Sequence, residues 1–478
     1  MPPKQTRRDF LKLSAMGLAA TTSVELLSAR KENTASALPA GAIEVWVTDS
    51  EARCARRTPI SWQSAPSESS GPTVILDPAK KFQSILGFGA AFTDSACYMF
   101  NQLTPASRER LFHEMFHPTE LGLSVCRTCI GSSDYSTKVY SYDEGDPDPR
   151  LERFSIEHDR GYILPVLREA RKVNPDLFLF SSPWSPPGWM KSGGSMLGGA
   201  MRRRYLADYA RYFVKFIEAY AAEGIPIQAV TPQNEVDTDQ DGRMPACIWP
   251  QEYEIEFVKQ LGPLLKQNNL ATKIWILDHN YNLWGRVVCE LDDPGLREYS
   301  QAVAWHGYAG EAEMMSRVHG AYPDVTMHWT EGGPDFTSPD YQTDWANWSG
   351  TFIAVLRNWC QSITGWNLAL DEKGQPNIGP FPCGGLVTIH ARTKEVTYSG
   401  QYWAIAHFSR FVRRGARRFE SQGTVPDLSH VAIENPGGER ILVLTNSGNS
   451  NRSVTLQVGH ANAHVEIKKS SVATLLWN

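Results

Sequence analysis

The sequence has no excess of positive charge. Its 478 residues include 47 Lys and Arg against 52 Asp and Glu, which gives a formal net charge of -5 and a pI near 6.2. A protein that binds nucleic acid needs a basic stripe to neutralise phosphates. The composition therefore argues against nucleic acid as a partner or substrate.

Long apolar runs are also missing. No stretch of about eighteen apolar residues follows the N-terminal region, so the sequence predicts no membrane span. At the N-terminus, Arg7 and Arg8 precede a mildly apolar run over 13–27, and 35–37 is a small-residue cleavage candidate. This pattern predicts a twin-arginine-type signal peptide over 1–37 and export to the periplasm or the outside, with a basic amphipathic helix as the alternative.

Cysteines are few, scattered and not arranged for zinc. Cys126 and Cys129 form a CxxC within a strand-like run, but no second pair stands at zinc spacing. The sequence favours buried thiols over a metal or redox centre, and it leaves disulfide pairing after export open. No repeat of solenoid period is present either.

Aromatic residues, by contrast, are abundant, with 15 Trp and 17 Tyr. Their faces stack well on the apolar faces of sugar rings, although any single Trp is more often a core residue. With 42% hydrophobic and 21% charged residues, a chain of this length is expected to form one large domain and a smaller one.

Eight short apolar runs alternate with helical segments and predict a (β/α)8 TIM barrel over 81–415. The predicted strands are 85–92, 123–127, 177–182, 225–230, 273–278, 303–306, 325–330 and 362–369. Short strands separated by Gly, Asn and Ser follow, and they predict a small β-sandwich over 416–478. Strands within 38–80 are expected to join that sandwich.

Two glutamates end predicted barrel strands. Glu235 follows the fourth strand and Glu331 the seventh, where side chains can face each other across the barrel mouth. Two carboxyls about 5 to 5.5 Å apart suit a retaining glycosidase, in which one protonates the leaving oxygen and the other attacks the anomeric carbon. We assign Glu235 as acid/base and Glu331 as nucleophile. The alternative is a pair of ordinary surface ion-pair carboxylates.

Five motifs stand out along the chain, in the order 87–94 (GFGAAFTD), 182–189 (SPWSPPGW), 229–235 (AVTPQNE), 306–308 (HGY) and 366–370 (WNLAL). Together they resemble glycoside hydrolase family 30, and the resemblance extends to its glucosylceramidases. The resemblance implies a retaining β-glycosidase and agrees with the assignment of Glu235 and Glu331.

The resemblance further implies a set of substrate-binding residues. Asp94, Trp184, Asn234 and Trp366 would line the subsite for the non-reducing sugar, and Tyr308 would approach the nucleophile. A carboxylate accepts hydrogen bonds from sugar hydroxyls, indoles supply stacking faces, and an amide beside the acid suits the 2-hydroxyl. For His306, a structural role and direct contact with the sugar are equally open.

The aglycone is open because the sequence departs from the glucosylceramidases at two places. Gly333 stands where they have a cysteine after the nucleophile, and Phe381 stands near a sugar-contacting asparagine. The expected substrate is a β-glucoside as in the glucosylceramidases, with sphingolipid metabolism as the expected context. A β-xyloside, a β-fucoside or β-1,6-glucan are the alternatives within the family.

Other classes of function are a non-catalytic carbohydrate-binding protein and a transglycosylase. A binding protein would have its carboxyls disabled, and both are present. Nothing in the sequence indicates a metal or an organic cofactor, because two carboxylates suffice for the chemistry.

Overall fold

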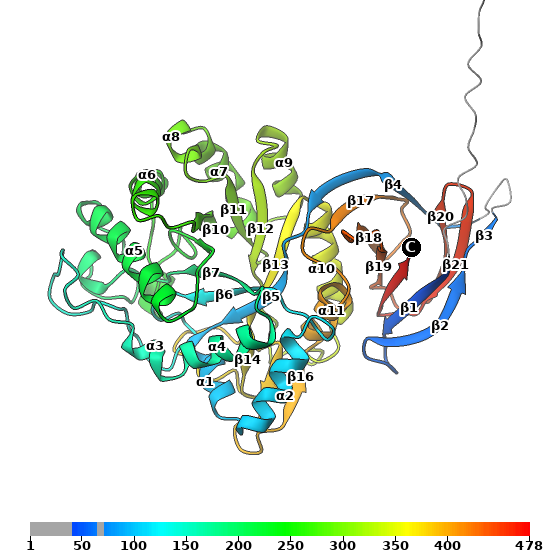
Figure 1. Cartoon of the computed structure of the whole chain (residues 1–478), viewed down its shortest axis with the longest axis horizontal. Helices are drawn as coiled ribbons and strands as arrows, with labels where there is room; N and C mark the ends of the chain where they lie inside the picture. The colour runs from blue at the N-terminus through cyan, green and yellow to red at the C-terminus, as the bar shows by residue number, and fades with distance from the viewer. Residues whose placement is uncertain (1–40, 65–70) are drawn as a thin grey trace, which may run out of the picture. The chain divides into compact units, whose positions relative to one another are not determined.

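A computed structural model describes residues 41–64 and 71–478 (Figure 1). The predicted signal peptide over 1–37 lies outside the described residues. No helix within the described ranges combines the length and the apolar character needed to cross a bilayer.

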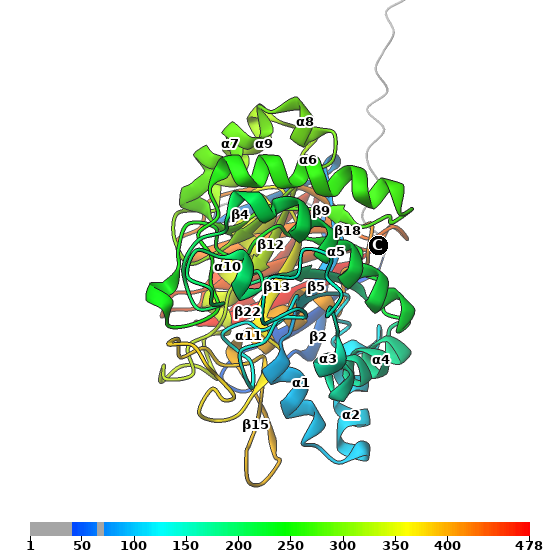
Figure 2. The same ribbon diagram turned by 90° about the vertical axis from the view of Figure 1, so that its left-hand side faces the viewer.

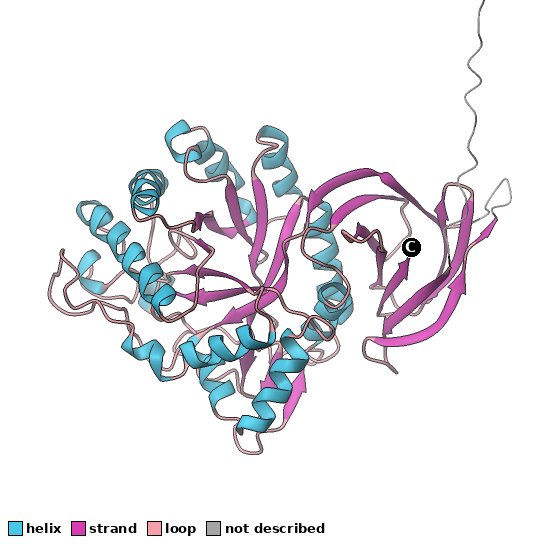
Figure 3. Cartoon of the chain, viewed as in Figure 1, coloured by secondary structure: helices cyan, strands magenta, loops and turns pink. Residues whose placement is uncertain are grey.

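A parallel sheet of nine strands winds into a barrel, which confirms the predicted TIM fold (Figures 1 and 3). The first and last barrel strands along the chain are joined because β13 pairs with β5, with Ser362 opposite Gly87. β9 and β10 occupy one strand position interrupted at Trp275, so the barrel has eight positions. The strands are β5 (Gly87–Phe92), β6 (Val125–Cys129), β7 (Phe178–Ser182), β8 (Ala229–Val230), β9 (Lys273–Ile274), β10 (Ile276–Asn280), β11 (Ala302–His306), β12 (Thr326–Glu331) and β13 (Cys360–Asn367).

Helices surround these strands (Figure 2). Helix α1 starts at Thr93, whose hydroxyl accepts a hydrogen bond from Ala96 N, and α2 starts in the same way at Thr104. Apolar residues at helical spacing form the buried face of α5. The helices are α1 (Asp94–Asn101), α2 (Pro105–Phe116), α3 (Glu157–Gly161), α4 (Ile163–Val173), α5 (Leu206–Ala222), α6 (Gln251–Gln267), α7 (Trp284–Leu291), α8 (Pro294–Arg297), α9 (Glu313–Ala321), α10 (Trp345–Arg357) and α11 (Gly400–Ser409).

The second sheet combines strands from both ends of the chain, as expected from the sequence. Its order is β2-β1-β22-β19-β18-β17-β4-β20-β21-β3, and β1 pairs with β22 so that Val45 lies opposite Leu475. The strands are β1 (Ala42–Thr48), β2 (Ala55–Ser61), β3 (Gln63–Ser64), β4 (Thr73–Ser84), β17 (Arg417–Gln422), β18 (Leu428–Glu434), β19 (Arg440–Asn446), β20 (Arg452–Val458), β21 (Ala461–Ile467) and β22 (Ser471–Trp477). A small third sheet holds β14 (Ala369–Leu370), β15 (Val387–Ile389) and β16 (Val396–Tyr398).

Close packing inside the barrel explains part of the first motif. All six residues of β5 are buried, and a Cβ placed on Gly89 would lie 1.8 Å from the carbonyl oxygen of Val125 in β6. Only glycine fits at that position. Trp305 and Trp329 are also fully buried, so these tryptophans belong to the core.

A buried histidine joins the last barrel helix to the sandwich. His407 of α11 contacts the hydroxyls of Thr474 in β22 and Thr48 in β1, both at 2.8 Å. The Thr474 hydroxyl donates to the His407 carbonyl oxygen, so the Nδ1–H of His407 must donate to Thr474. The ring is therefore neutral with Nε2 accepting from Thr48, and burial lowers the pKa of His407 to about 3.

The free energy of unfolding is predicted to depend on this histidine at acid pH. The unfolded chain protonates His407 at its ordinary pKa of about 6.5, whereas the native state does so only near 3. Its contribution is thus present above about pH 6.5 and is lost as the pH falls. Between pH 6 and 4, His407→Gln should reduce the slope of unfolding free energy against pH by about 1.4 kcal/mol per unit in urea titrations. Equal slopes in the two proteins would contradict the neutral, buried state of this ring.

Candidate active site

A cavity of about 450 Å³ lies at the carboxyl ends of the barrel strands. It combines carboxylates, amides and aromatic rings, the set that a sugar-binding pocket needs. The lining residues are Asp134, Trp184, Asn234, Glu235, Asp237, Thr238, Gln240, Met244, His279, Asn280, Tyr308, Glu331, Gly333, Pro334, Asp335, Trp366, Phe381, Pro382 and Cys383.

A fully buried arginine lies beneath this cavity. Arg127 of β6 donates to Asp278 Oδ2 at 2.7 Å, to Asn234 Oδ1 at 2.8 Å and to Glu331 Oε2. Its Nε donates to Ser182 Oγ at 3.1 Å, and the centre of the guanidinium lies 4.6 Å from the Trp184 ring. The guanidinium therefore holds the ends of several barrel strands in one arrangement.

Asp278 at the end of β10 is the second centre of this network. Its Oδ1 accepts from His306 Nε2 at 3.0 Å and from the Thr330 hydroxyl at 2.8 Å. Burial favours the neutral acid, but Arg127 and His306 outweigh burial and hold the pKa of Asp278 well below its usual range. Asp278 is therefore ionised and fully bonded, which makes it a structural anion rather than a reactant.

Glu331 is held at both carboxylate oxygens. Oε2 accepts from Arg127, and Oε1 accepts from the Tyr308 hydroxyl at 3.1 Å. Its side chain is 7% exposed, so one edge faces the cavity. Burial raises the pKa of Glu331, against the opposing charges of His306 and Arg127.

Glu235 stands in a left-handed backbone conformation, with φ of 52°. Such a conformation is uncommon for a residue with a side chain and is typical of functional positions. Its backbone N–H donates to the Asp278 carbonyl oxygen at 3.0 Å, and its Oε2 accepts from Gln240 Nε2 at 3.0 Å. Asp278 has a φ of 52° as well, so the two residues joined by this hydrogen bond adopt the same unusual backbone conformation.

One imidazole lies between the two glutamates. His306 Nδ1 is 3.6 Å from Glu235 Oε1, and His306 Nε2 is 3.8 Å from Glu331 Oε2. Burial alone would lower the pKa of this ring, but the charge of Glu331 and the contacts with Asp278 and Glu235 raise it to about 9. The structure thus brings the two predicted carboxyls to opposite sides of one histidine, and His306 itself is completely buried.

The pKa of Glu235 responds to its neighbours more than to burial. Burial raises it, but the contact with His306 and the charges of His279 and His306 hold it below the usual value. Of the two glutamates, Glu331 therefore has the raised pKa and Glu235 the lowered one. The cause is the imidazolium of His306 beside Glu235.

The predicted aromatic residues lie on the cavity wall. The rings of Trp184 and Trp366 are stacked on one another, with centroids 4.8 Å apart, and both line the cavity. Tyr308 is 48% exposed and Phe381 is 39% exposed, so these two rings lie at the mouth. Asn234 lines the cavity while its Oδ1 accepts from Arg127.

The structure places Asp94 outside the cavity, contrary to the sequence-based expectation. Its side chain is buried outside the cavity lining, and its oxygens accept from Thr137 N at 2.7 Å, from Tyr162 Oη at 2.9 Å and from His158 Nε2. It is also the first residue of α1, so its carboxylate fixes the helix start and the loop above it. Its hydrogen-bonding capacity is used within the protein.

Asp134 occupies the position that Asp94 was expected to fill. It lines the cavity with Trp184 and Trp366, it is 4% exposed, and its Oδ1 has no hydrogen-bond partner within the described residues. Burial, together with the charges of Glu331 and Glu235, raises the pKa of Asp134 well above the usual value. The sequence signal was the polar loop 132–136 after the second strand, which carries this aspartate.

The loop after β14 brings the thiol of Cys383 close to Gly333. A Cβ added to Gly333 would lie 3.4 Å from the Sγ of Cys383. The sequence departs from the glucosylceramidases at Gly333, and the structure brings a cysteine from another segment to the same neighbourhood.

The contrast between Asp134 and Asp94 predicts opposite phenotypes. Asp134→Asn should lower kcat/KM by about 10- to 100-fold, because a hydrogen bond between a buried carboxyl and the substrate contributes about 1–3 kcal/mol. Asp94→Asn should lower the melting temperature and change kcat/KM far less. Steady-state kinetics and thermal denaturation of the two variants check this, and a larger loss of kcat/KM in Asp94→Asn would contradict the placement.

Buried carboxyls at the carboxyl ends of a TIM barrel, beside aromatic rings in one cavity, indicate a glycosidase. Comparison with known proteins identifies the family. Residues 85–412 match the glycosyl hydrolase family 30 TIM-barrel domain, and residues 415–475 match the glycosyl hydrolase family 30 beta sandwich domain. The chain belongs to glycoside hydrolase family 30 and is a glycoside hydrolase that acts on glycan substrates.

The proteins similar to this chain include some named endo-1,6-beta-glucanases and some named glucosylceramidases. An endo-1,6-beta-D-glucanase of Neurospora crassa is 33% identical over 422 residues, covering 84% of this chain and 86% of the relative. The lysosomal acid glucosylceramidase of Mus musculus is 28% identical over 412 residues, covering 81% and 79%. The solved structure of the endo-beta1,6-glucanase BT3312 superimposes with a TM-score of 0.82 at 31% identity, covering 92% of this chain and 99% of that one.

Proposed function

We propose that this protein hydrolyses β-glucosidic bonds with retention of configuration, with Glu331 as nucleophile and Glu235 as acid/base. The contacts of Glu331 carry this assignment. A permanently charged guanidinium and a phenol hold its two oxygens, which keeps the carboxylate oriented toward the cavity. Glu235 instead has a neutral amide and two titratable imidazoles around it, so its charge can change during the reaction.

The reaction then runs in two displacements. In the first, Glu331 attacks the anomeric carbon while Glu235 gives its proton to the departing glycosidic oxygen. In the second, Glu235 takes a proton from water, and the resulting hydroxide displaces Glu331 from the same carbon. Tyr308 and Arg127 donate to the oxygens of Glu331 throughout and stabilise the carboxylate when it leaves.

A β-1,6-linked glucan is the substrate that we propose. Beyond the aromatic wall, the cavity is lined mainly by polar side chains, namely Asp237, Thr238, Gln240, Asn280 and Asp335. Such a wall can hydrogen-bond a second sugar, and the exposed rings of Tyr308 and Phe381 offer faces for it at the mouth. The relatives named as β-1,6-glucanases support the same choice.

Glucosylceramide is the second candidate, and an apolar feature favours it. Leu197 and Ile248 are 41% and 38% exposed on the two loops that meet at Met244, a cavity residue. Apolar side chains there could contact a lipid chain leaving the pocket.

Export by the twin-arginine route remains our proposal from residues 1–37 alone.

The roles of the two glutamates predict different defects. Glu331→Gln should abolish turnover on every substrate, because no covalent intermediate can form. Glu235→Gln should lose about 10²- to 10⁴-fold on substrates with poor leaving groups and far less on dinitrophenyl β-glucoside, whose leaving group needs no proton. Rapid-quench kinetics check this, and a Glu331→Gln enzyme with substantial turnover would contradict the assignment.

Substrate class and stereochemistry are tested together. Proton NMR of the reaction with a β-1,6-gluco-oligosaccharide should show the β-anomer of the new reducing end first, with faster cleavage than of glucosylceramide in detergent or of aryl β-xyloside. The α-anomer as the first product would contradict retention. Preferential cleavage of glucosylceramide would favour the second candidate instead.

A further inference from the structure

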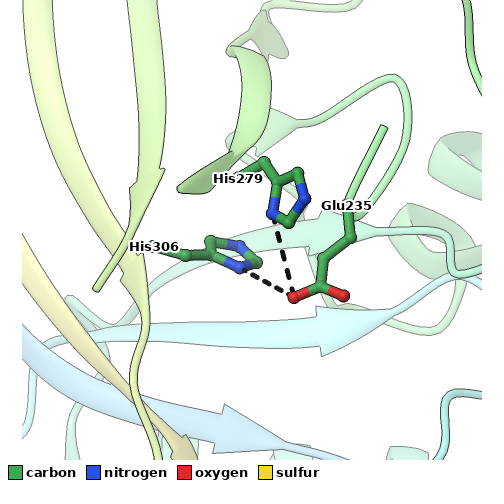
Figure 4. Close-up of side chains that lie close together, drawn as sticks. All are labelled: Glu235, His279 and His306. Carbon is green, nitrogen blue, oxygen red and sulfur yellow. Dashed lines mark ion pairs between the residues drawn. The ribbon is translucent and has the colours of Figure 1, made fainter. Parts of the chain in front are cut away.

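Two histidines in the active site have free nitrogens that face one carboxylate oxygen. His279 Nδ1 lies 3.8 Å and His306 Nδ1 lies 3.6 Å from Glu235 Oε1, and the three ligand atoms lie within 4.8 Å of one another (Figure 4). Both Nδ1 atoms are buried, and neither has a hydrogen-bond partner within the described part of the chain. The mechanism proposed above leaves both nitrogens unexplained.

The far side of each imidazole is bound to a carboxylate. His279 Nε2 contacts Asp237 Oδ1 at 2.6 Å, and His306 Nε2 contacts Asp278 Oδ1 at 3.0 Å. An ionised carboxylate only accepts, so each Nε2 carries a proton, and Nδ1 is the nitrogen left to bind a metal ion. A metal ion that binds Nδ1 of His306 displaces the proton that the raised pKa of this ring leaves there. Metal-bound histidines in proteins have this same carboxylate partner on the other nitrogen.

The spacing also suits a small transition-metal ion. Bonds of about 2.0–2.1 Å in tetrahedral geometry place ligand atoms about 3.3 Å apart. The distances of 3.6 and 3.8 Å from the two Nδ1 atoms to Glu235 Oε1 are close to that value, and the side chains would draw together around a bound ion. Glu235 Oε2 is held by Gln240, which leaves Oε1 as a single ligand atom. The carboxylates of Asp335 and Glu331 line the same cavity and add negative charge that attracts a cation.

We propose that Glu235, His279 and His306 form a binding site for a divalent transition-metal ion such as Zn²⁺, and that the bound ion inhibits the enzyme. Two imidazoles and one carboxylate form a ligand set that suits zinc, with the fourth position open to the cavity. A coordinated Glu235 cannot give its proton to the leaving oxygen. The inhibition rests on the role proposed for Glu235, whereas the binding itself does not.

The test is calorimetric titration of the full-length protein with Zn²⁺, compared among variants. His279→Ala removes a ligand and should weaken binding at this site at least about tenfold. Asp237→Asn removes the carboxylate behind His279 and should weaken it about 10- to 100-fold. Because the Asp237 side chain is 46% exposed, this second variant tests the site without disturbing the core.

A matched control tests a second pair of histidines, which lies at the surface and competes for Zn²⁺. His113 and His117, at the C-terminal end of α2, stack with centroids 4.5 Å apart and could bind Zn²⁺ adventitiously. His113→Ala should leave the affinity of the active-site position unchanged. Wild-type affinity in His279→Ala, or a loss of binding in His113→Ala alone, would overturn the proposal.

Inhibition is measured separately on an aryl β-glucoside. Zn²⁺ should inhibit at the concentration that half-saturates the calorimetric site, and a chelator should restore the rate. An active enzyme whose Zn²⁺ binding does not depend on His279 overturns the metal site and leaves the proposed function standing. A protein that binds Zn²⁺ through His279 but cleaves no β-glucoside supports the site and overturns the proposed function.

Discussion

The buried guanidinium of Arg127 is the interaction on which the active site depends. It pairs with Asp278 and Glu331 while both charged partners are almost without solvent, and it also fixes Asn234. Burying a charge is unfavourable unless partners compensate it, so removing Arg127 would leave two carboxylates uncompensated in the barrel. The strand ends, the proposed nucleophile Glu331 and Asn234 are therefore positioned by one side chain.

The same network explains why the charges around the two glutamates of one small cavity respond differently to pH. Arg127 is a permanent charge, so the environment of Glu331 changes little with pH, whereas Glu235 faces His279 and His306, whose charges can change. The two histidines that surround Glu235 are also the two imidazole ligands of the proposed metal site. One arrangement of side chains thus underlies the proposed catalysis and the proposed inhibition.

Much of the fold was predictable from the sequence because barrel strands are short, buried apolar runs that end in polar residues. The strand positions of the barrel follow that pattern. The sandwich follows a different one, namely short strands separated by Gly, Asn and Ser. Asp94 was misplaced because a polar residue after a strand can turn toward the cavity or cap a helix, and only tertiary contacts decide between the two. Arg127 was missed because a single charge within an apolar run does not reveal its partners, which lie 55 to 204 residues further along the chain.

The central claim is that Glu331 forms the covalent bond to the sugar. Incubation with an activated 2-deoxy-2-fluoro-β-glucoside slows the second displacement and traps the intermediate, and mass spectrometry of the digested protein locates the label. The account predicts one fluoroglucosyl group per chain on the peptide that contains Glu331. A label on Glu235, or hydrolysis with no labelled peptide and inversion at the anomeric carbon, would contradict it.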